Sequence, residues 1–63
     1  MPSDAAELSS LSTALSELER RLVAIAGHYD GTDRDDLQAA LFEAERQLRA
    51  AHRSVERAAR LAG

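Results

Sequence analysis

The stretch Gly27–Asp33, which reads Gly-His-Tyr-Asp-Gly-Thr-Asp, constrains the fold more than any other part of the chain. Two of the three glycines gather there with two aspartates and a threonine, a composition typical of turns. On either side lies a long segment that contains neither proline nor glycine, at 3–26 and 34–62. The sequence therefore predicts one all-α antiparallel hairpin, with a helix over 4–27, a turn over 28–32 and a second helix over 33–62.

The first predicted helix carries a regular apolar repeat. Its large apolar residues recur at spacings of three and four, which makes them the a and d positions of a heptad repeat: Leu8, Leu11, Leu15, Leu18, Leu22 and Ile25. Tyr29 falls on the next a position. Asp4, with Glu7 three residues later, is the expected N-terminal cap, and Gly27 is the expected residue just past the helix end.

The second predicted helix continues the repeat with smaller residues. Its a positions are Leu41, Leu48, Val55 and Ala62, and its d positions are Leu37, Ala44, Ala51 and Ala58. Thr32 or Asp33 is the expected cap. When the two helices fold back on each other, large residues of the first meet small ones of the second, as in the expected pairs Leu22 with Ala44 and Leu15 with Ala51. This seam, coiled-coil-like in its spacing, is the predicted core.

A chain of 63 residues without cysteine has few means of stabilising itself. The core of a chain this short rarely contributes more than roughly 3–5 kcal/mol, so we expect it to associate, most simply as a homodimer that forms a four-helix bundle. Val23, Ala26 and Phe42 are expected to form an apolar patch beside the seam near the turn, with Ala14, Ala40 and Leu61 on the opposite flank. The predicted partner interface is Val23, Phe42, Leu61, Leu15, Leu22 and Leu48.

The arginines of the second half suggest an alternative function. All eight basic residues are arginine, and five of them form an anion-binding candidate along the second helix: Arg46, Arg49, Arg53, Arg57 and Arg60. Such a ridge would serve a nucleic-acid- or nucleotide-binding regulator, because guanidinium groups bind phosphate. The net charge of −3 and the interleaved Glu45 and Glu56 favour a solvated helix face. A third hypothesis is a helical partner of a larger protein, such as an antitoxin or an anti-sigma-like subunit.

Catalytic, cofactor-binding and metal-binding sites are not predicted. His52 and Glu56 have the spacing of two ligands on one helix face, but the Glu-x-x-His element of di-iron bundles is missing, and we expect a surface or flank histidine. The acids from Asp30 to Asp36 do not match the EF-hand pattern. We therefore expect a non-enzymatic interaction module or regulatory subunit. The absence of cysteine, of a signal-peptide pattern and of a membrane span suggests a cytoplasmic protein, and the exclusive use of arginine suggests a bacterial one.

Overall fold

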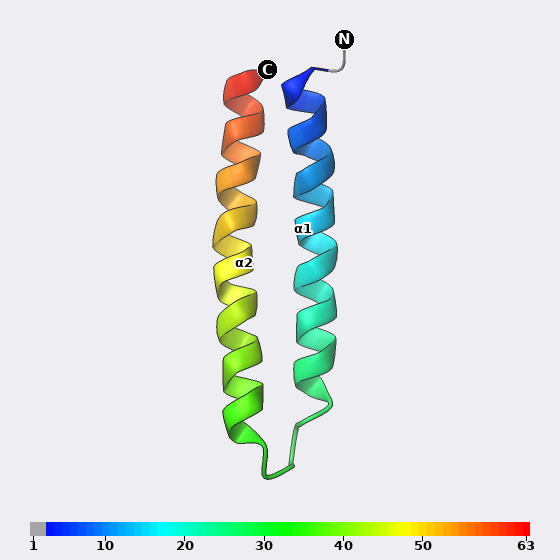
Figure 1. Cartoon of the computed structure of the whole chain (residues 1–63), viewed down its shortest axis with the longest axis vertical. Coiled ribbons are helices and arrows are strands. Elements are labelled where there is room, and N and C mark those ends of the chain that lie inside the picture. The colour runs from blue at the N-terminus through cyan, green and yellow to red at the C-terminus, as the bar shows by residue number, and fades with distance from the viewer. Residues whose placement is uncertain (1–2) are drawn as a thin grey trace.

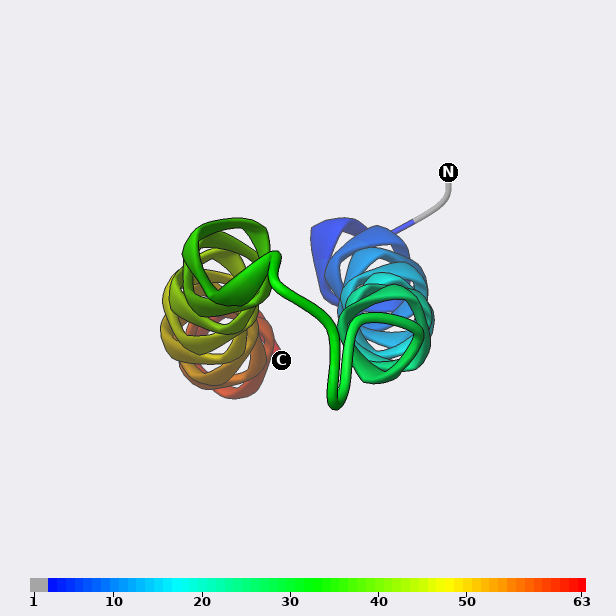
Figure 2. The same cartoon turned by 90° about the horizontal axis from the view of Figure 1, so that it is seen from below.

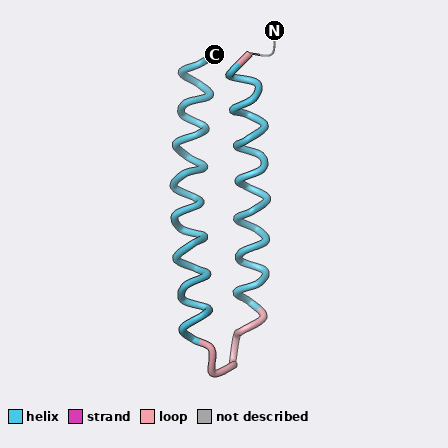
Figure 3. The backbone as a smooth tube through the Cα atoms, in the orientation of Figure 1, coloured by secondary structure: helices cyan, strands magenta, loops and turns pink. Residues whose placement is uncertain are grey.

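The chain forms two long antiparallel helices joined by one turn. The computed structural model describes residues 3–63 and places α1 at Asp4–Gly27 and α2 at Asp35–Ala62. The two helices lie side by side over their whole length, with the turn at one end and the start of α1 and the end of α2 at the other (Figures 1 and 3). The principal extents are 51 × 15 × 10 Å. The predicted all-α antiparallel hairpin is confirmed.

The N-cap of α1 lies one residue earlier in the chain than the sequence suggested. Ser3 is extended (φ −77°, ψ 147°), and its Oγ accepts a hydrogen bond from the Ala6 N–H at 3.1 Å. Ser3 is therefore the N-cap, and the prediction that Asp4 has this role is wrong, because Asp4 already has a place in the first helical turn. Asp4 and Glu7 still complement the positive end of the helix dipole there.

The other end of α1 also differs from expectation. Gly27 is the last residue of α1, and His28 follows it in a right-handed conformation (φ −64°, ψ −18°). Gly27 is therefore not the left-handed residue past the helix end. Gly31 has that conformation instead, with φ +73°, and it reverses the chain in the middle of the turn. Figure 2, which looks along the helices, shows this loop passing from one helix to the other.

Thr32 closes the turn rather than capping α2. Its N–H and its hydroxyl both donate to the Tyr29 carbonyl, at 3.2 and 2.7 Å, and its Oγ1 accepts from the Arg34 N–H at 3.2 Å. The helix α2 begins at Asp35, two residues later than predicted, and its N-cap Arg34 makes no side-chain capping bond. Asp36 in the first turn is hydrogen-bonded by Arg34, and this bond, with the Leu37 N–H, lowers the pKa of the Asp36 carboxyl.

Gln38 ties the turn end of the two helices together. Its Nε2 donates to the Ala26 carbonyl at 3.0 Å and also contacts Oδ1 of Asp30. The side chain of Ala26 has no exposed surface. Among residues 3–63, Ala26 is the one apolar residue that is completely buried. The expectation that Ala26 belongs to an exposed patch is wrong, because this residue faces α2.

The seam between the helices is rotated relative to the predicted one. The a residues of α1 that were expected there, Leu8, Leu15 and Leu22, are half-buried, as are Leu41, Leu48 and Val55 of α2. The d residues of α1 are not in the seam: Leu11, Leu18 and Ile25 are 49%, 43% and 43% exposed. The second row of the seam instead consists of the residues at position e, each of which lies four residues after a position a. On α1 these are Ser12, Glu19 and Ala26, and on α2 they are Gln38, Glu45, His52 and Ala59.

Gly27 at the end of α1 and Gly31 in the turn should respond in opposite ways to the same substitution. Gly31→Ala should lower the free energy of unfolding by about 1 kcal/mol, because a Cβ disfavours a positive φ. Gly27→Ala should raise it by about 0.5 kcal/mol, because Gly27 is helical and a Cβ there meets nothing within 4 Å. Urea unfolding of both variants at one protein concentration, followed by far-UV circular dichroism, checks this. Equal midpoints would contradict the assigned turn.

Candidate interaction surface

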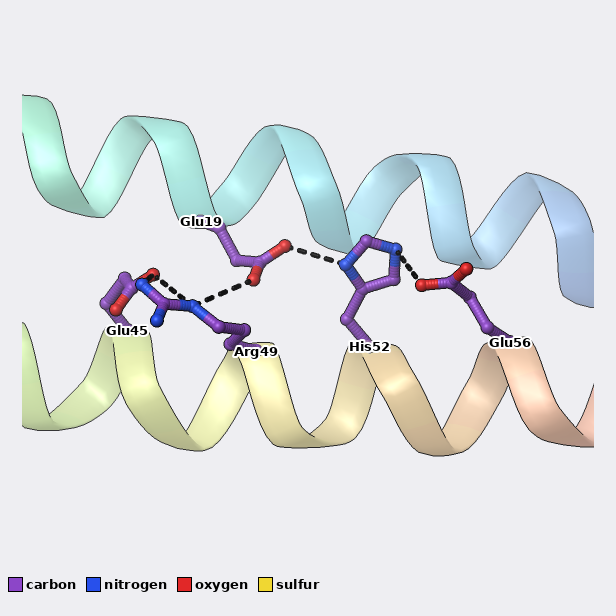
Figure 4. A network of polar contacts seen from close by, with 5 residues as sticks. All are labelled: Glu19, Glu45, Arg49, His52 and Glu56. Atoms are coloured by element: carbon purple, nitrogen blue, oxygen red, sulfur yellow. Dashed lines mark hydrogen bonds and ion pairs between the residues drawn. The ribbon is translucent and has the colours of Figure 1, made fainter.

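A network of charged side chains crosses the seam near the middle of the hairpin. Glu19 of α1 lies between His52 and Arg49 of α2 (Figure 4). Its Oε2 is 2.8 Å from Nδ1 of His52, and its Oε1 is 4.0 Å from Nε of Arg49. Because only 14% of the Glu19 side chain is exposed, its charge is partly removed from water, and contacts with His52 and Arg49 offset that loss.

His52 contacts a carboxylate with each ring nitrogen. Besides Nδ1 on Glu19, its Nε2 is 3.1 Å from Oε1 of Glu56, one turn further along α2. An imidazole that carries both protons can donate to the two carboxylates at once, whereas a neutral ring can donate to only one. His52 is more buried than the surface or flank histidine that we expected, since most of its side chain is covered and it lies in the second row of the seam.

Glu45 extends the network towards the turn. It is the most buried ionisable residue among 3–63, at 6% exposure, and its Oε1 accepts from Nε of Arg49 at 3.1 Å. Glu45 and Arg49 therefore form an ion pair one turn apart on α2. Glu56, the other acid among the arginines of α2, contacts His52.

The sequence contains a signal for the polar row, although not for the distances across it. Glu19, Glu45 and His52 all lie at position e, on helices that run in opposite directions, and the e positions of an antiparallel pair face the same side. An acid on one helix and a histidine or arginine on the other at this position can pair across the seam. The two apolar rows concealed this signal, because they suggested that the e positions would be exposed.

The rotation leaves one long face of the hairpin apolar. We call it the leucine–alanine face, and it contains the d residues of both helices, which lie on the same side of an antiparallel pair. From α1 it has Leu11, Leu18 and Ile25, and from α2 it has Leu37, Ala44, Ala51 and Ala58, flanked by Ala40 and by Leu61, which is 78% exposed.

Charge is nearly absent from this face. On α2 every residue at positions a, d and g between Leu37 and Ala62 is uncharged, the polar ones being Gln47 and Ser54. On α1, Arg21 is the one charged residue at these positions between Leu8 and Ile25. A charge-free strip of this length on a water-facing helix is typical of a binding surface.

The opposite face of the hairpin, which we call the polar face, has charged and hydroxyl side chains around a few apolar ones. Val23 and Phe42 are exposed there near the turn, and Val23 lines a shallow hollow with Glu19, Arg20 and Glu45. Towards the chain ends the same face has a shallow groove of about 430 Å³, and it is lined by Ala5, Ser9, Ser12, Thr13, Glu56, Ala59 and Arg60. Of the predicted interface residues, Val23 and Phe42 therefore lie on this polar face, Leu61 borders the leucine–alanine face, and Leu15, Leu22 and Leu48 lie in the seam.

The arginines of α2 divide into two groups. Arg46 pairs with Glu43, and Arg49 pairs with Glu45 and Glu19. Arg53, Arg57 and Arg60 make no ion pair within residues 3–63. The candidate anion-binding ridge therefore has its available charge in the last three turns of α2.

Neither helix of the described chain is long and apolar enough to cross a membrane. Residues 3–63 contain no group of three or more histidine or acidic side chains placed to hold a metal ion. Comparison of the chain with family models, with curated proteins and with solved structures finds no match.

Glu19→Gln tests whether the network holds the two helices together. This change should lower the free energy of unfolding by about 1–2 kcal/mol, because it weakens the hydrogen bond with His52 and removes the ion pair with Arg49, both partly shielded from water. Glu17→Gln is the matched control on the same helix. The exposed Glu17 is bonded by Arg20, which lowers its pKa, and loss of such a surface pair should leave the stability nearly unchanged. Thermal or urea unfolding measures both, and equal effects would contradict the role given to Glu19.

Proposed function

We propose that this chain is a small non-enzymatic protein–protein interaction module that associates with a second copy of itself through the leucine–alanine face, forming a four-helix bundle. The observation that supports this most directly is the small size of the hairpin's own hydrophobic core. Among residues 3–63, Ala26 is the one apolar residue with no exposed surface, and no large side chain is fully buried. Most of the burial that a stable fold needs must then come from association.

The surface area of the hairpin supports the same proposal. The chain exposes 4672 Å², whereas a compact folded chain of 6.8 kDa exposes about 4,000 Å². The excess of about 700 Å² is close to the area of about 800 Å² that each partner buries in a standard interface. The leucine–alanine face extends along both helices, with its residues spread from Leu11 to Ile25 on α1 and from Leu37 to Ala58 on α2.

Phe42 and Val23 belong to a smaller patch that is separated from this face by the seam. Val23 shares a hollow with Arg20, Glu19 and Glu45, so charged side chains lie next to this patch. We therefore assign the self-association to the leucine–alanine face and leave Val23 and Phe42 outside the dimer interface.

A matched pair of substitutions tests this assignment. Leu18 and Phe42 are equally exposed, at 43% and 42%, and lie on opposite sides of the hairpin. Leu18→Glu should weaken the dimer at least about 100-fold, because an unpaired carboxylate is costly in an apolar interface, while Phe42→Glu should leave it intact. Sedimentation equilibrium at micromolar concentration measures both.

Three other outcomes have distinct meanings. Dissociation by Phe42→Glu alone would place the interface on the polar face. A wild-type chain that is monomeric yet fully helical would contradict self-association. A wild-type chain that is monomeric and poorly helical would instead favour the helical partner of a larger protein, because such a chain folds when its partner is added.

A second function, phosphate binding, rests on Arg53, Arg57 and Arg60. They lack ion pairs within residues 3–63 and occupy positions c and f, away from the leucine–alanine face, so they would stay accessible in the dimer. Binding to a short DNA or RNA duplex, followed by fluorescence anisotropy, should then weaken as salt rises above ~50 mM. Arg53→Gln should weaken it further, and Arg46→Gln, whose arginine is already paired with Glu43, should have a smaller effect. Absence of binding at ~50 mM salt would exclude this function.

A further inference from the structure

We infer that the two copies pair about a two-fold axis that runs parallel to the helices, so that α1 of each copy lies on α2 of the other and both turns lie at the same end. This inference rests on the proposed self-association. It concerns which of two arrangements the leucine–alanine face permits. Two hairpins stacked face to face can be related by an axis along the helices or by an axis that crosses them.

The leucine–alanine face is built from unequal halves. The half on α1 presents Leu11, Leu18 and Ile25, which are large and stand out into solvent. The half on α2 presents alanine at three of its four d positions, 44, 51 and 58, with Ala40 beside them. One half is therefore a ridge of large side chains and the other is a strip of small ones, which is the relation that lets two surfaces interdigitate.

The ridge and the strip also lie at matching levels along the rod. Glu19 is level with the turn of α2 that contains Arg49 and His52, and Ala5 lies beside Gly63 at the open end. Because the helices are antiparallel, Leu18 is then level with Ala51. Heptad steps in opposite directions bring Leu11 level with Ala58 and Ile25 level with Ala44.

An axis parallel to the helices keeps these levels unchanged in the dimer. It places Leu11 against the partner's Ala58, Leu18 against the partner's Ala51 and Ile25 against the partner's Ala44, and the same contacts occur a second time by symmetry. All three large residues thus meet a small one without any shift along the rod. The full length of the leucine–alanine face is covered.

An axis across the helices gives a poorer match. It sets α1 on α1 and α2 on α2, so that large residues face large ones along one edge and alanines face alanines along the other. The distance between packed helices varies from 8 to 10 Å and depends on the size of the side chains at the contact. Two rigid hairpins would therefore touch along the leucine edge and leave a gap along the alanine edge. Protein interiors tolerate few such voids.

Charge acts in the opposite direction but is weaker. The turn carries Asp30, Asp33, Asp35 and Asp36 against the single Arg34, so the inferred arrangement brings two acidic ends together. These side chains are exposed, and at physiological ionic strength exposed charges interact weakly beyond about 8 Å. A steric gap is not screened by salt. Packing therefore decides the arrangement.

Pulsed dipolar electron paramagnetic resonance on the full chain tests the inference. The chain has no cysteine, so Asp33→Cys in the exposed turn accepts a single nitroxide label. The inferred dimer should give a distance below about 30 Å between the two labels, because neighbouring helices of a bundle lie 8–10 Å apart. A distance near the 51 Å length of the hairpin would overturn the inference, because it requires the turns to be at opposite ends.

Arg20→Cys provides the control. Arg20 is exposed near the middle of α1, where either arrangement brings the two labels within measurable distance. A signal from this label together with a long distance at residue 33 means that the dimer exists but is arranged across the helices. Absence of an intermolecular distance from both labels means that no dimer forms, and it overturns the proposed function as well as the inference.

Discussion

The carboxylate of Glu19 determines how the two helices face each other. A carboxylate that is largely withdrawn from water needs charged or hydrogen-bonding partners, and His52 and Arg49 supply them in one rotation of the helices. With this pairing the e positions occupy the second row of the seam. The leucines of α1 at position d are then turned towards solvent, together with the alanines of α2. The polar contact inside the hairpin and the apolar face outside it are therefore two results of the same rotation.

The repeat of leucines predicted the hairpin and one of its two rows correctly. It misplaced Leu11, Leu18 and Ile25, because an apolar repeat shows which residues avoid water but does not show whether the same chain or another one covers them. The decision lies with the polar residues at position e. Their pairing energy depends on distances across the seam, such as the 2.8 Å between Glu19 and His52, and these follow from the register of two helices rather than from either one.

The glycines and acids predict where the turn lies, but they do not predict which hydrogen bonds form inside it. Whether Ser3 or Asp4 caps α1, and whether Thr32 caps α2 or closes the turn, depends on backbone dihedral angles that composition does not specify. Gln38 illustrates the same point. Its amide is informative only once α2 has brought it next to the Ala26 carbonyl, which lies twelve residues earlier in the chain.

Ala26 is the one apolar residue in the described chain that the hairpin seals completely, and this has a consequence for the protein in a cell. In the proposed dimer, folding and association are one equilibrium, so the folded fraction rises with the total amount of protomer. At low abundance the chain would spend more time open and would be exposed to proteases. The module would then persist where its synthesis exceeds a threshold and be cleared where it does not, without any regulator other than its own concentration.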